Sequence, residues 1–369
     1  MGDTTPINID GTAITKQYLL TLTIDERKEQ LIKVMKYYRD YGFPYPKYDD
    51  NTILRDFSAL KDFDTNTIID GDRLRDSTAA GLKVFKHFCP QIYDVYRGNK
   101  PSMVQAFNND SILKKCLENR MGISYMGINR YGQDFIAIFN ITNGMIRQGL
   151  RNGYFSSQVS IFKPAIAKAI YDKYTKENDI VYDFSIGFGQ RLAGALSCKN
   201  NLKYIGCDPW DKCVNEAREI GRFFGRENDV VVEQAGSEVY CPEEFIGKVS
   251  LAFSSPPYFN MEVYDNNNST QAYSGGMDYF VNVWFDKTLE NMSKLLKEDG
   301  IIALNIPQNI FAILNGKLKN YNFEVKTVLY VQLTRNAKFH VKESKTKLEP
   351  IYIIGKSEPL IPPPVFSSK

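Results

Sequence analysis

Histidine and paired cysteine are scarce in this chain, and their scarcity disfavours several kinds of site. There are only two histidines, His87 and His340, and no C-x-x-C pair occurs among the six scattered cysteines (Cys89, Cys116, Cys198, Cys207, Cys213 and Cys241). A structural zinc site needs such ligands at close, regular spacing. We therefore expect no metal site, and free thiols in a reducing compartment.

Long apolar runs and a strong charge of one sign are also missing. No basic segment followed by an apolar core opens the chain, and no run approaches membrane-spanning length. We therefore expect a cytoplasmic location and no membrane partner. The formal net charge is only +3 and the pI about 8.3. A nucleic-acid partner is compatible with this balance but is not required by it.

The composition is that of a soluble globular protein with room for two domains. The chain has 369 residues, of which 43% are hydrophobic and 24% charged. Apolar spacing over 23–41 indicates an amphipathic helix, with Thr23 and Asp25 near its start. We predict a mainly helical accessory or recognition domain over residues 1–150, in which no motif points to chemistry.

From about residue 153 onward, strands alternate with helices. Helices are expected at 163–174, 191–197, 211–224, 278–296 and 308–318, and strands at 180–184, 204–207, 229–233, 248–253, 300–305, 325–333 and 350–354. This alternation predicts an α/β domain over residues 151–369. Its sheet should be mostly parallel and twisted, with helices on both faces.

A glycine turn follows the first strand of this set. Asp183-Phe-Ser-Ile-Gly187-Phe-Gly189 has glycines two apart, which let the backbone turn tightly and approach a ligand. The next strand ends in Asp208, which is placed to accept hydrogen bonds from ribose hydroxyls; a helix N-cap is the competing interpretation. No third glycine follows Gly189, and an acid beside the turn suits an amino-bearing cation. The turn therefore favours S-adenosylmethionine over NAD.

The strand at 249–254 ends in Ser255-Pro256-Pro257-Tyr258. Two consecutive prolines lack N–H donors and fix φ, so the ladder stops there. A hydroxyl, backbone carbonyls and an aromatic ring then face the space beyond the strand ends, where open α/β sheets bind ligands. A plain strand terminator would look the same, but the glycine turn upstream favours a functional interpretation.

These two motifs, in this order, resemble those of the S-adenosylmethionine-dependent amino-group DNA methyltransferases, which make N4-methylcytosine or N6-methyladenine. The resemblance covers about residues 153–356. It implies a Rossmann-like methyltransferase fold with an antiparallel C-terminal hairpin, and S-adenosylmethionine as cofactor. The cofactor contacts that it implies are Phe162 and Lys163 upstream, Asp183, Phe184, Gly187 and Gly189 in the glycine turn, Asp208, Pro209 and Trp210 around ribose and adenine, and Gly236 and Ser237 on the adenine side.

The same resemblance places the target base at Ser255, Pro256, Pro257 and Tyr258. An exocyclic amine is a poor nucleophile because its lone pair is delocalised into the ring. The Ser255 hydroxyl and the Pro256 carbonyl can accept its N–H bonds as charge develops. Tyr258 can stack on a base that has been extruded from a duplex. Serine at this position leans toward cytosine N4 in the family, and adenine N6 stays open.

Other reactions are weighed against this one. Cytosine-C5 methylation needs a cysteine nucleophile after a proline, but the chain offers only Cys89-Pro90 and Cys241-Pro242, in the reverse order. Methylation of an RNA base or of a protein glutamine amide remains an alternative, because related folds use similar turns. A catalytically silent nucleic-acid-binding subunit with the same fold is a further alternative.

Double-stranded DNA is the expected partner, in a restriction-modification, phage or orphan setting. Tyr264 follows the catalytic turn in a polar stretch, where it could stack on bases; packing within the protein is the competing interpretation. Arg335, Lys338 and Lys342 lie between the last two strands and could contact phosphates. A solvated hairpin tip would have the same basic composition.

Overall fold

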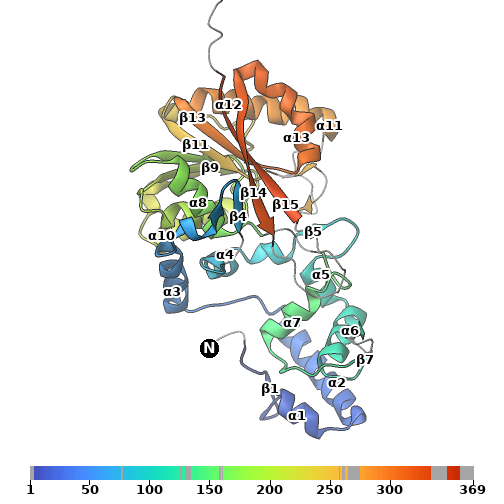
Figure 1. Ribbon diagram of the computed structural model, residues 1–369. Coiled ribbons are helices and arrows are strands. Elements are labelled where there is room, and N and C mark those ends of the chain that lie inside the picture. The colour runs from blue at the N-terminus through green and yellow to red at the C-terminus, as the bar shows by residue number, and fades with distance from the viewer. Residues whose placement is uncertain are drawn as a thin grey trace, which may run out of the picture.

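A large body built on one sheet and a smaller helical body make up the molecule, as the computed structural model shows (Figure 1). The structure describes residues 4–75, 78–124, 127–128, 134–157, 159, 161–256, 258–259, 262–264, 275–333 and 347–357. No helix in these ranges is long and apolar enough to cross a membrane.

The sheet has nine strands in the order β10-β9-β8-β11-β13-β15-β14-β4-β3. Their bounds are β8 Ile180–Asp183, β9 Lys203–Asp208, β10 Val230–Gln234, β11 Val249–Ser254, β13 Leu296–Asn305, β14 Phe323–Leu333, β15 Lys347–Lys356, β4 Arg73–Arg75 and β3 Ile69–Asp70. The strands from β10 to β13 are parallel, whereas β15 runs antiparallel to both β13 and β14. The predicted Rossmann-like methyltransferase fold, with its antiparallel C-terminal hairpin, is confirmed.

Each face of the sheet carries its own apolar core, because successive side chains of a strand point to opposite faces. Val181 and Leu251 face the core that α8 Pro164–Tyr174, α9 Gln190–Ser197 and α10 Asp211–Phe223 cover. Tyr182 and Ala252 face the core under α12 Asp286–Leu295 and α13 Gln308–Leu314. The helix expected over 278–296 begins as α11 Gly276–Tyr279 and the wider turns of η6 Phe280–Phe285 before α12.

The helical body has a separate core. Its elements are β1 Asn8–Ile9, β2 Thr12–Ala13, α1 Lys16–Thr21, α2 Ile24–Tyr41, α5 Met103–Asn108, α6 Asp110–Arg120 and α7 Asn143–Leu150. The start of α2 agrees with the predicted position, because Thr23 and Glu26 form a capping box that satisfies its first amides. Shorter described elements complete the chain: β6 Gly127–Ile128, β7 Asp134–Phe135, β12 Glu262–Val263, η3 Glu227–Asp229, η4 Glu243–Phe245 and η7 Asn315–Tyr321.

Residues 50–97, which lie between α2 and α5 of the helical body, pack with the large body built on the sheet. This segment contains α3 Asp50–Lys61, η1 Thr65–Ile68, β3, β4, α4 Leu82–Phe88, η2 Pro90–Tyr93 and β5 Tyr96–Arg97. Ile53, Leu74 and Phe85 lie in the same core as α8 and α9. Strand β4 adds to the sheet edge, pairing Leu74 with Val331 of β14 in parallel. The cores therefore divide the chain differently from the single boundary near residue 150, because this pairing joins segments far apart in the sequence.

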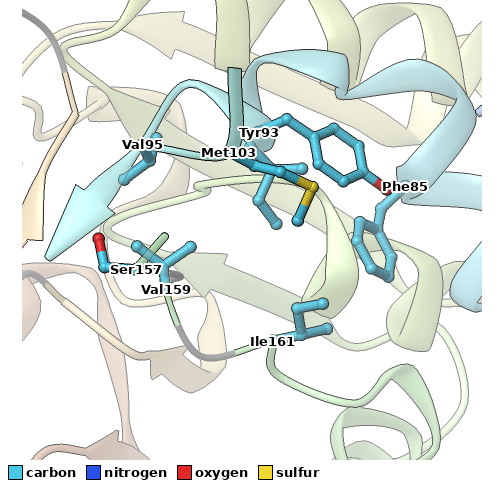
Figure 2. A pocket seen from close by; sticks show the side chains of 8 residues that line it. Phe85, Tyr93, Val95, Met103, Ser157, Val159 and Ile161 are labelled. Carbon is cyan, nitrogen blue, oxygen red and sulfur yellow. The ribbon is translucent and has the colours of Figure 1, made fainter. Parts of the chain in front are cut away.

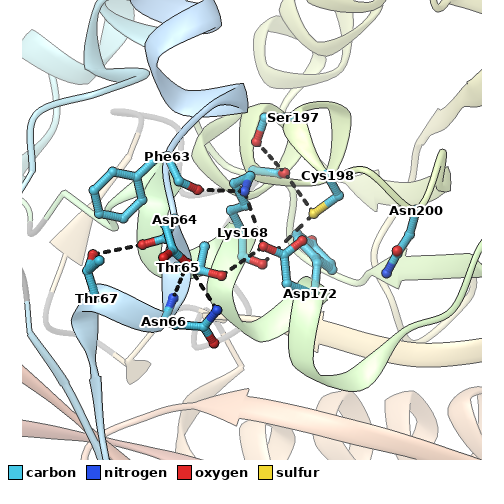
Figure 3. A network of polar contacts seen from close by, with 12 residues as sticks. Phe63, Asp64, Thr65, Asn66, Thr67, Lys168, Asp172, Ser197, Cys198 and Asn200 are labelled. Carbon is cyan, nitrogen blue, oxygen red and sulfur yellow. Dashed lines mark hydrogen bonds and ion pairs between the residues drawn. The ribbon is translucent and has the colours of Figure 1, made fainter.

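A buried polar network fastens that segment to α8 (Figure 3). The Lys168 ammonium, on a side chain only 3% exposed, donates to the Phe63 carbonyl at 2.9 Å and pairs with Asp172 at 3.2 Å. Thr65 donates to the same carboxylate at 2.9 Å. These bonds satisfy a charge that would otherwise be costly to bury, so the network fixes where η1 meets the sheet body.

We expect Lys168→Met to lower the free energy of unfolding by about 3 kcal/mol, because it removes the buried ammonium that bonds to both the Phe63 carbonyl and Asp172. Urea unfolding followed by circular dichroism measures this change. Lys173→Met on the same helix is the matched control, because Lys173 is exposed and should shift stability by no more than about 0.5 kcal/mol. Equal effects of the two substitutions would contradict a stabilising role for the network.

Candidate functional site

The glycine turn lies at the carboxyl end of β8, between that strand and α9. Gly187 and Gly189 have φ of +58° and +71°, which L side chains rarely adopt. A Cβ on Gly189 would lie 2.8 Å from Ile220 Cδ1, whereas one on Gly187 would meet only the Ser185 carbonyl oxygen, at 3.9 Å. Gly189 therefore serves the packing of α9, and Gly187 leaves room above the strand ends.

The Asp183 carboxylate is fully buried and binds the protein's own donors. Arg191 Nε and the Tyr204 hydroxyl reach Oδ2 at 2.8 and 2.7 Å, and Ser254 Oγ reaches Oδ1 at 2.8 Å. Burial alone would lower the pKa of Arg191, but the Asp183 charge raises it above its usual range. The sequence suggested Asp183 for a cofactor amino group. In the structure this carboxylate joins β8, β9, β11 and α9.

The same arginine supports the turn itself. Arg191 Nη2 donates to the Ser185 carbonyl and, at 3.3 Å, to the Ile186 carbonyl. Buried backbone carbonyls need such partners. Arg191 thus fixes the shape of the glycine turn. Its position two residues after Gly189, where the sequence only showed that a third glycine is absent, did not indicate this role.

Asp208, at the end of β9, faces the glycine turn. Its Oδ2 accepts the Gly187 N–H at 2.9 Å and its Oδ1 accepts the Trp210 N–H at 3.0 Å. Helix α10 is capped by Trp210 without a side-chain bond, so Asp208 is not its N-cap. Burial, at 9% exposure, raises the pKa of Asp208 to about 6, although both amides oppose the rise. Each carboxylate oxygen keeps further acceptor capacity.

Three aromatic rings gather beside this acid. Phe188 of the glycine turn, Trp210 after β9 and Tyr264 after β12 have ring centroids 6.3 to 6.4 Å apart. Tyr264 was predicted to stack on nucleic-acid bases. In the structure its ring packs against those of Phe188 and Trp210, so it lines the region beside the glycine turn and Asp208.

A second polar cluster follows β11. Ser255 Oγ lies 3.0 Å from the Tyr258 hydroxyl, and both hydroxyls reach Asn305 Oδ1, at 3.1 and 3.2 Å. Asn305 ends β13, whose Leu304 pairs with Ser254 of β11. Asn305 was not among the site residues predicted from the sequence. A polar residue at the end of the neighbouring parallel strand was the available signal, but its use requires the strand order.

Several predicted cofactor residues support the site without facing it. Phe184 is 1% exposed and packs in the core with Tyr182. The Phe162 ring meets the Phe253 ring at a centroid distance of 5.7 Å. Lys163 precedes α8 and donates to the Thr78 carbonyl at 3.1 Å.

The predicted adenine-side residues follow β10. Ser237 is buried, and its Oγ lies 2.8 Å from Thr288 Oγ1 of α12. A Cβ on Gly236 would collide with the Glu238 carboxylate at 2.3 Å. Pro209, next to Asp208, accepts a bond from Gln234 Nε2 at 3.4 Å. The bond from Gln234 thus links the ends of β10 and β9, whereas Ser237 is bonded to α12.

Four predicted residues, Pro257, Arg335, Lys338 and Lys342, lie outside the described residues. Pro256 is described and buried. Within the described ranges, no group of three or more His, Cys, Asp or Glu side chains is placed to hold a metal ion.

The segment after the Ser-Pro-Pro-Tyr turn is attached to the N-terminal half of the chain. Strand β12 pairs antiparallel with β5, joining Glu262 to Arg97 and Val263 to Tyr96. Nearby, a cavity of about 30 Å³ is lined by Phe85, Ile92, Tyr93, Val95, Met103, Ser157, Val159 and Ile161 (Figure 2). It is apolar and has room for little more than a water or two, so it holds neither a cofactor nor a base.

No protein-family model and no curated protein sequence matches the chain. Among solved structures, TrmN from Thermus thermophilus has a TM-score of 0.38 at 16% identity, covering 52% of this chain and 48% of its own. Geranyl diphosphate methyltransferase in complex with SAM has a TM-score of 0.38 at 11% identity, and the match covers 53% of this chain and 85% of that one. Precorrin-6y C5,15-methyltransferase from Geobacter metallireducens GS-15 has a TM-score of 0.33 at 16% identity, and the match covers 52% of this chain and 84% of that one.

The chain thus spans about half the length of the TrmN structure and most of the other two. Scores and identities this low indicate no substrate.

We expect Asp208→Asn to change how stability depends on pH. Folding raises the pKa of Asp208 from 3.8 to about 6, so the folded protein binds this proton more tightly than the unfolded chain does. Stability is therefore lost as pH rises from about 4 to 6. Over that range the variant should gain about 2 kcal/mol relative to the wild type, measured by urea unfolding at each pH.

Taking the difference between wild type and variant cancels the contribution of other acids with a raised pKa, such as the half-buried Glu216. Burial raises the pKa of Glu216 to about 7, and this carboxyl is present in both proteins. A stability difference that stays constant with pH would show that Asp208 has an ordinary pKa.

Proposed function

We propose that this protein transfers a methyl group from S-adenosylmethionine to the exocyclic amino nitrogen of a DNA base, with cytosine N4 slightly favoured over adenine N6. The observation that supports this most is the cluster of neutral acceptors at Ser255, Tyr258 and Asn305, which ends two strands of the sheet that also carries the glycine turn.

The described residues fit S-adenosylmethionine. The remaining lone pairs of Asp208 suit two ribose hydroxyls, and the rings of Phe188 and Trp210 suit a purine. Gly187 leaves space beside this acid. When bound, the cofactor supplies an electrophilic methyl group on a sulfonium. Asp183 acts at one remove, because its carboxylate already holds Arg191 and Ser254.

The acceptor cluster performs the chemistry on the substrate side. Ser255 Oγ accepts one N–H of the amine, and the Pro256 carbonyl is the second acceptor. These bonds favour the pyramidal nitrogen whose lone pair points at the methyl group. Once it carries the methyl group, the nitrogen is positively charged and acidic and releases its proton to solvent water, so no strong base is required beforehand.

The cysteines favour a mechanism without a covalent intermediate. Cys89 is 1% exposed, and burial raises the pKa of its thiol well above the usual range. Burial also raises the pKa of Cys241. Reactive cysteines have lowered pKa values, so neither Cys-Pro sequence offers an activated thiolate.

Duplex DNA is the proposed partner, and Tyr258 would stack on an extruded base. The proposed location is the cytoplasm. The enzyme would belong to a restriction-modification system or a phage, or act as an orphan methyltransferase. Arg335, Lys338 and Lys342 are the proposed phosphate contacts. Methylation of an RNA base or a protein glutamine amide, or a silent binding subunit, would each give a different result in the following assay.

The full chain should transfer radiolabelled methyl groups to duplex DNA, and mass analysis of the digested nucleosides should identify N4-methylcytosine or N6-methyladenine. Label in RNA or protein instead would move the substrate to those classes. Cofactor binding by calorimetry without transfer to any of them would indicate the silent subunit.

We expect Ser255→Ala to reduce kcat by about 10²-fold, because one acceptor around the developing charge is lost, with cofactor affinity unchanged. Ser250→Ala is the matched control. Ser250 lies at the other end of β11, accepts a bond from Lys297 at 2.7 Å, and should leave kcat intact. Full activity of Ser255→Ala would remove the hydroxyl from the mechanism.

A further inference from the structure

We propose that Asn305 is a positioning residue that fixes Ser255 as a hydrogen-bond acceptor, so that the site selects a substrate atom bearing N–H over a carbonyl oxygen. This inference rests on the proposed function and adds a residue and a selection rule to it.

The amide of Asn305 has one orientation. The side chain lies at the end of β13 and is 2% exposed. Its Nδ2 donates to the Pro350 carbonyl at 3.0 Å, on the antiparallel neighbour β15. A carbonyl oxygen only accepts, so the reversed amide would set two acceptors against each other. The Oδ1 atom must therefore face Ser255 and Tyr258.

This orientation favours a Ser255 proton inside the cluster, because a proton that points outward would leave the Ser255 oxygen facing the acceptor Asn305 Oδ1 at 3.1 Å. A serine hydroxyl has one proton and two acceptor lone pairs. Its two partners are Asn305 Oδ1 at 3.1 Å and the Tyr258 hydroxyl at 3.0 Å. If the proton points to either of them, it lies within the cluster. Because Asn305 Oδ1 cannot donate, it accepts a hydrogen bond from Ser255, from Tyr258 or from both.

Ser255 is partly exposed. With its proton held inside the cluster, its oxygen keeps a lone pair for a substrate donor. An amino N–H can donate to it, whereas a carbonyl oxygen would meet a lone pair. A site built to bond an N–H rejects the analogue that lacks it strongly, because its polar groups are left unpaired. The chemical class selected is thus an aromatic amine or an amide nitrogen, and the deaminated base is disfavoured.

The test compares binding of two target bases in the presence of S-adenosylhomocysteine. Duplexes carry either the amino base identified by product analysis or its deaminated counterpart, uracil for cytosine or hypoxanthine for adenine. Each stands opposite an abasic site, so that unpairing costs are equal. Fluorescence anisotropy gives the affinity ratio for the wild type, Asn305→Leu and Asn305→Asp.

We expect the wild type to prefer the amino base by at least about tenfold, and Asn305→Leu to reduce this ratio to about one, because its serine hydroxyl can rotate and donate to a carbonyl. Asn305→Asp keeps an acceptor for both hydroxyls and, with its other oxygen protonated in this buried position and donating to the Pro350 carbonyl, should retain most of the ratio. A merely structural role for Asn305 would lower stability or overall affinity and leave the ratio unchanged.

Ser255→Ala provides a second measurement that does not depend on how Asn305→Leu folds. It should abolish the same ratio, and the double variant should show no further loss, since Asn305 acts through Ser255. Undiminished selectivity in Asn305→Leu or Ser255→Ala, while the wild type still methylates DNA, would overturn this inference alone. A wild type that methylates no amino group would overturn both the inference and the proposed function.

Discussion

The site depends on the buried ion pair between Asp183 and Arg191. Its atoms are 2.8 Å apart, and both side chains are at most 5% exposed. Removing either partner would leave an uncompensated charge in the core. The pair also recruits Tyr204 from β9 and Ser254 from β11, so one carboxylate connects three strands and the first turn of α9. The protein's own bonds therefore hold the glycine turn in its shape, which lowers the cost of ordering it on binding.

Two adjacent serines at the end of β11 contact different parts of the site. Ser254 turns to Asp183 and the glycine turn, and Ser255 turns to Asn305 and Tyr258. This opposition follows from the alternation of side chains along a strand. A shift of one residue in the register of β11 would exchange the two hydroxyls. The bulged pairing of β11 with β8 and β13 sets that register, so strand pairing in the core determines which serine contacts Asn305 and Tyr258.

The alternating sheet, the glycine turn and the strand end at Ser255 could be predicted because each is written in local sequence. The role of Arg191 could not, because a buried arginine next to a glycine turn shows its partner only once the fold closes over Asp183. Asn305 depends on strand order, and the pairing of β4 with β14 joins distant segments. For the same reason α3 and α4 were assigned to a separate domain although their apolar faces belong to the sheet's core. Non-local pairings leave little trace in local patterns.

The charges around the two halves of the site differ in a way that bears on the reaction. On the side of the glycine turn are the carboxylates of Asp183 and Asp208, both engaged by buried donors. On the side of Ser255, the contacts described are all neutral: two hydroxyls and an amide. A carboxylate beside an amine would bind its protonated, non-nucleophilic form as well as the neutral one, whereas neutral acceptors give little stabilisation to an extra positive charge. Neutral acceptors therefore suit an aromatic amine or an amide, whose nitrogen carries no charge before transfer, and do not suit a lysine-like ammonium.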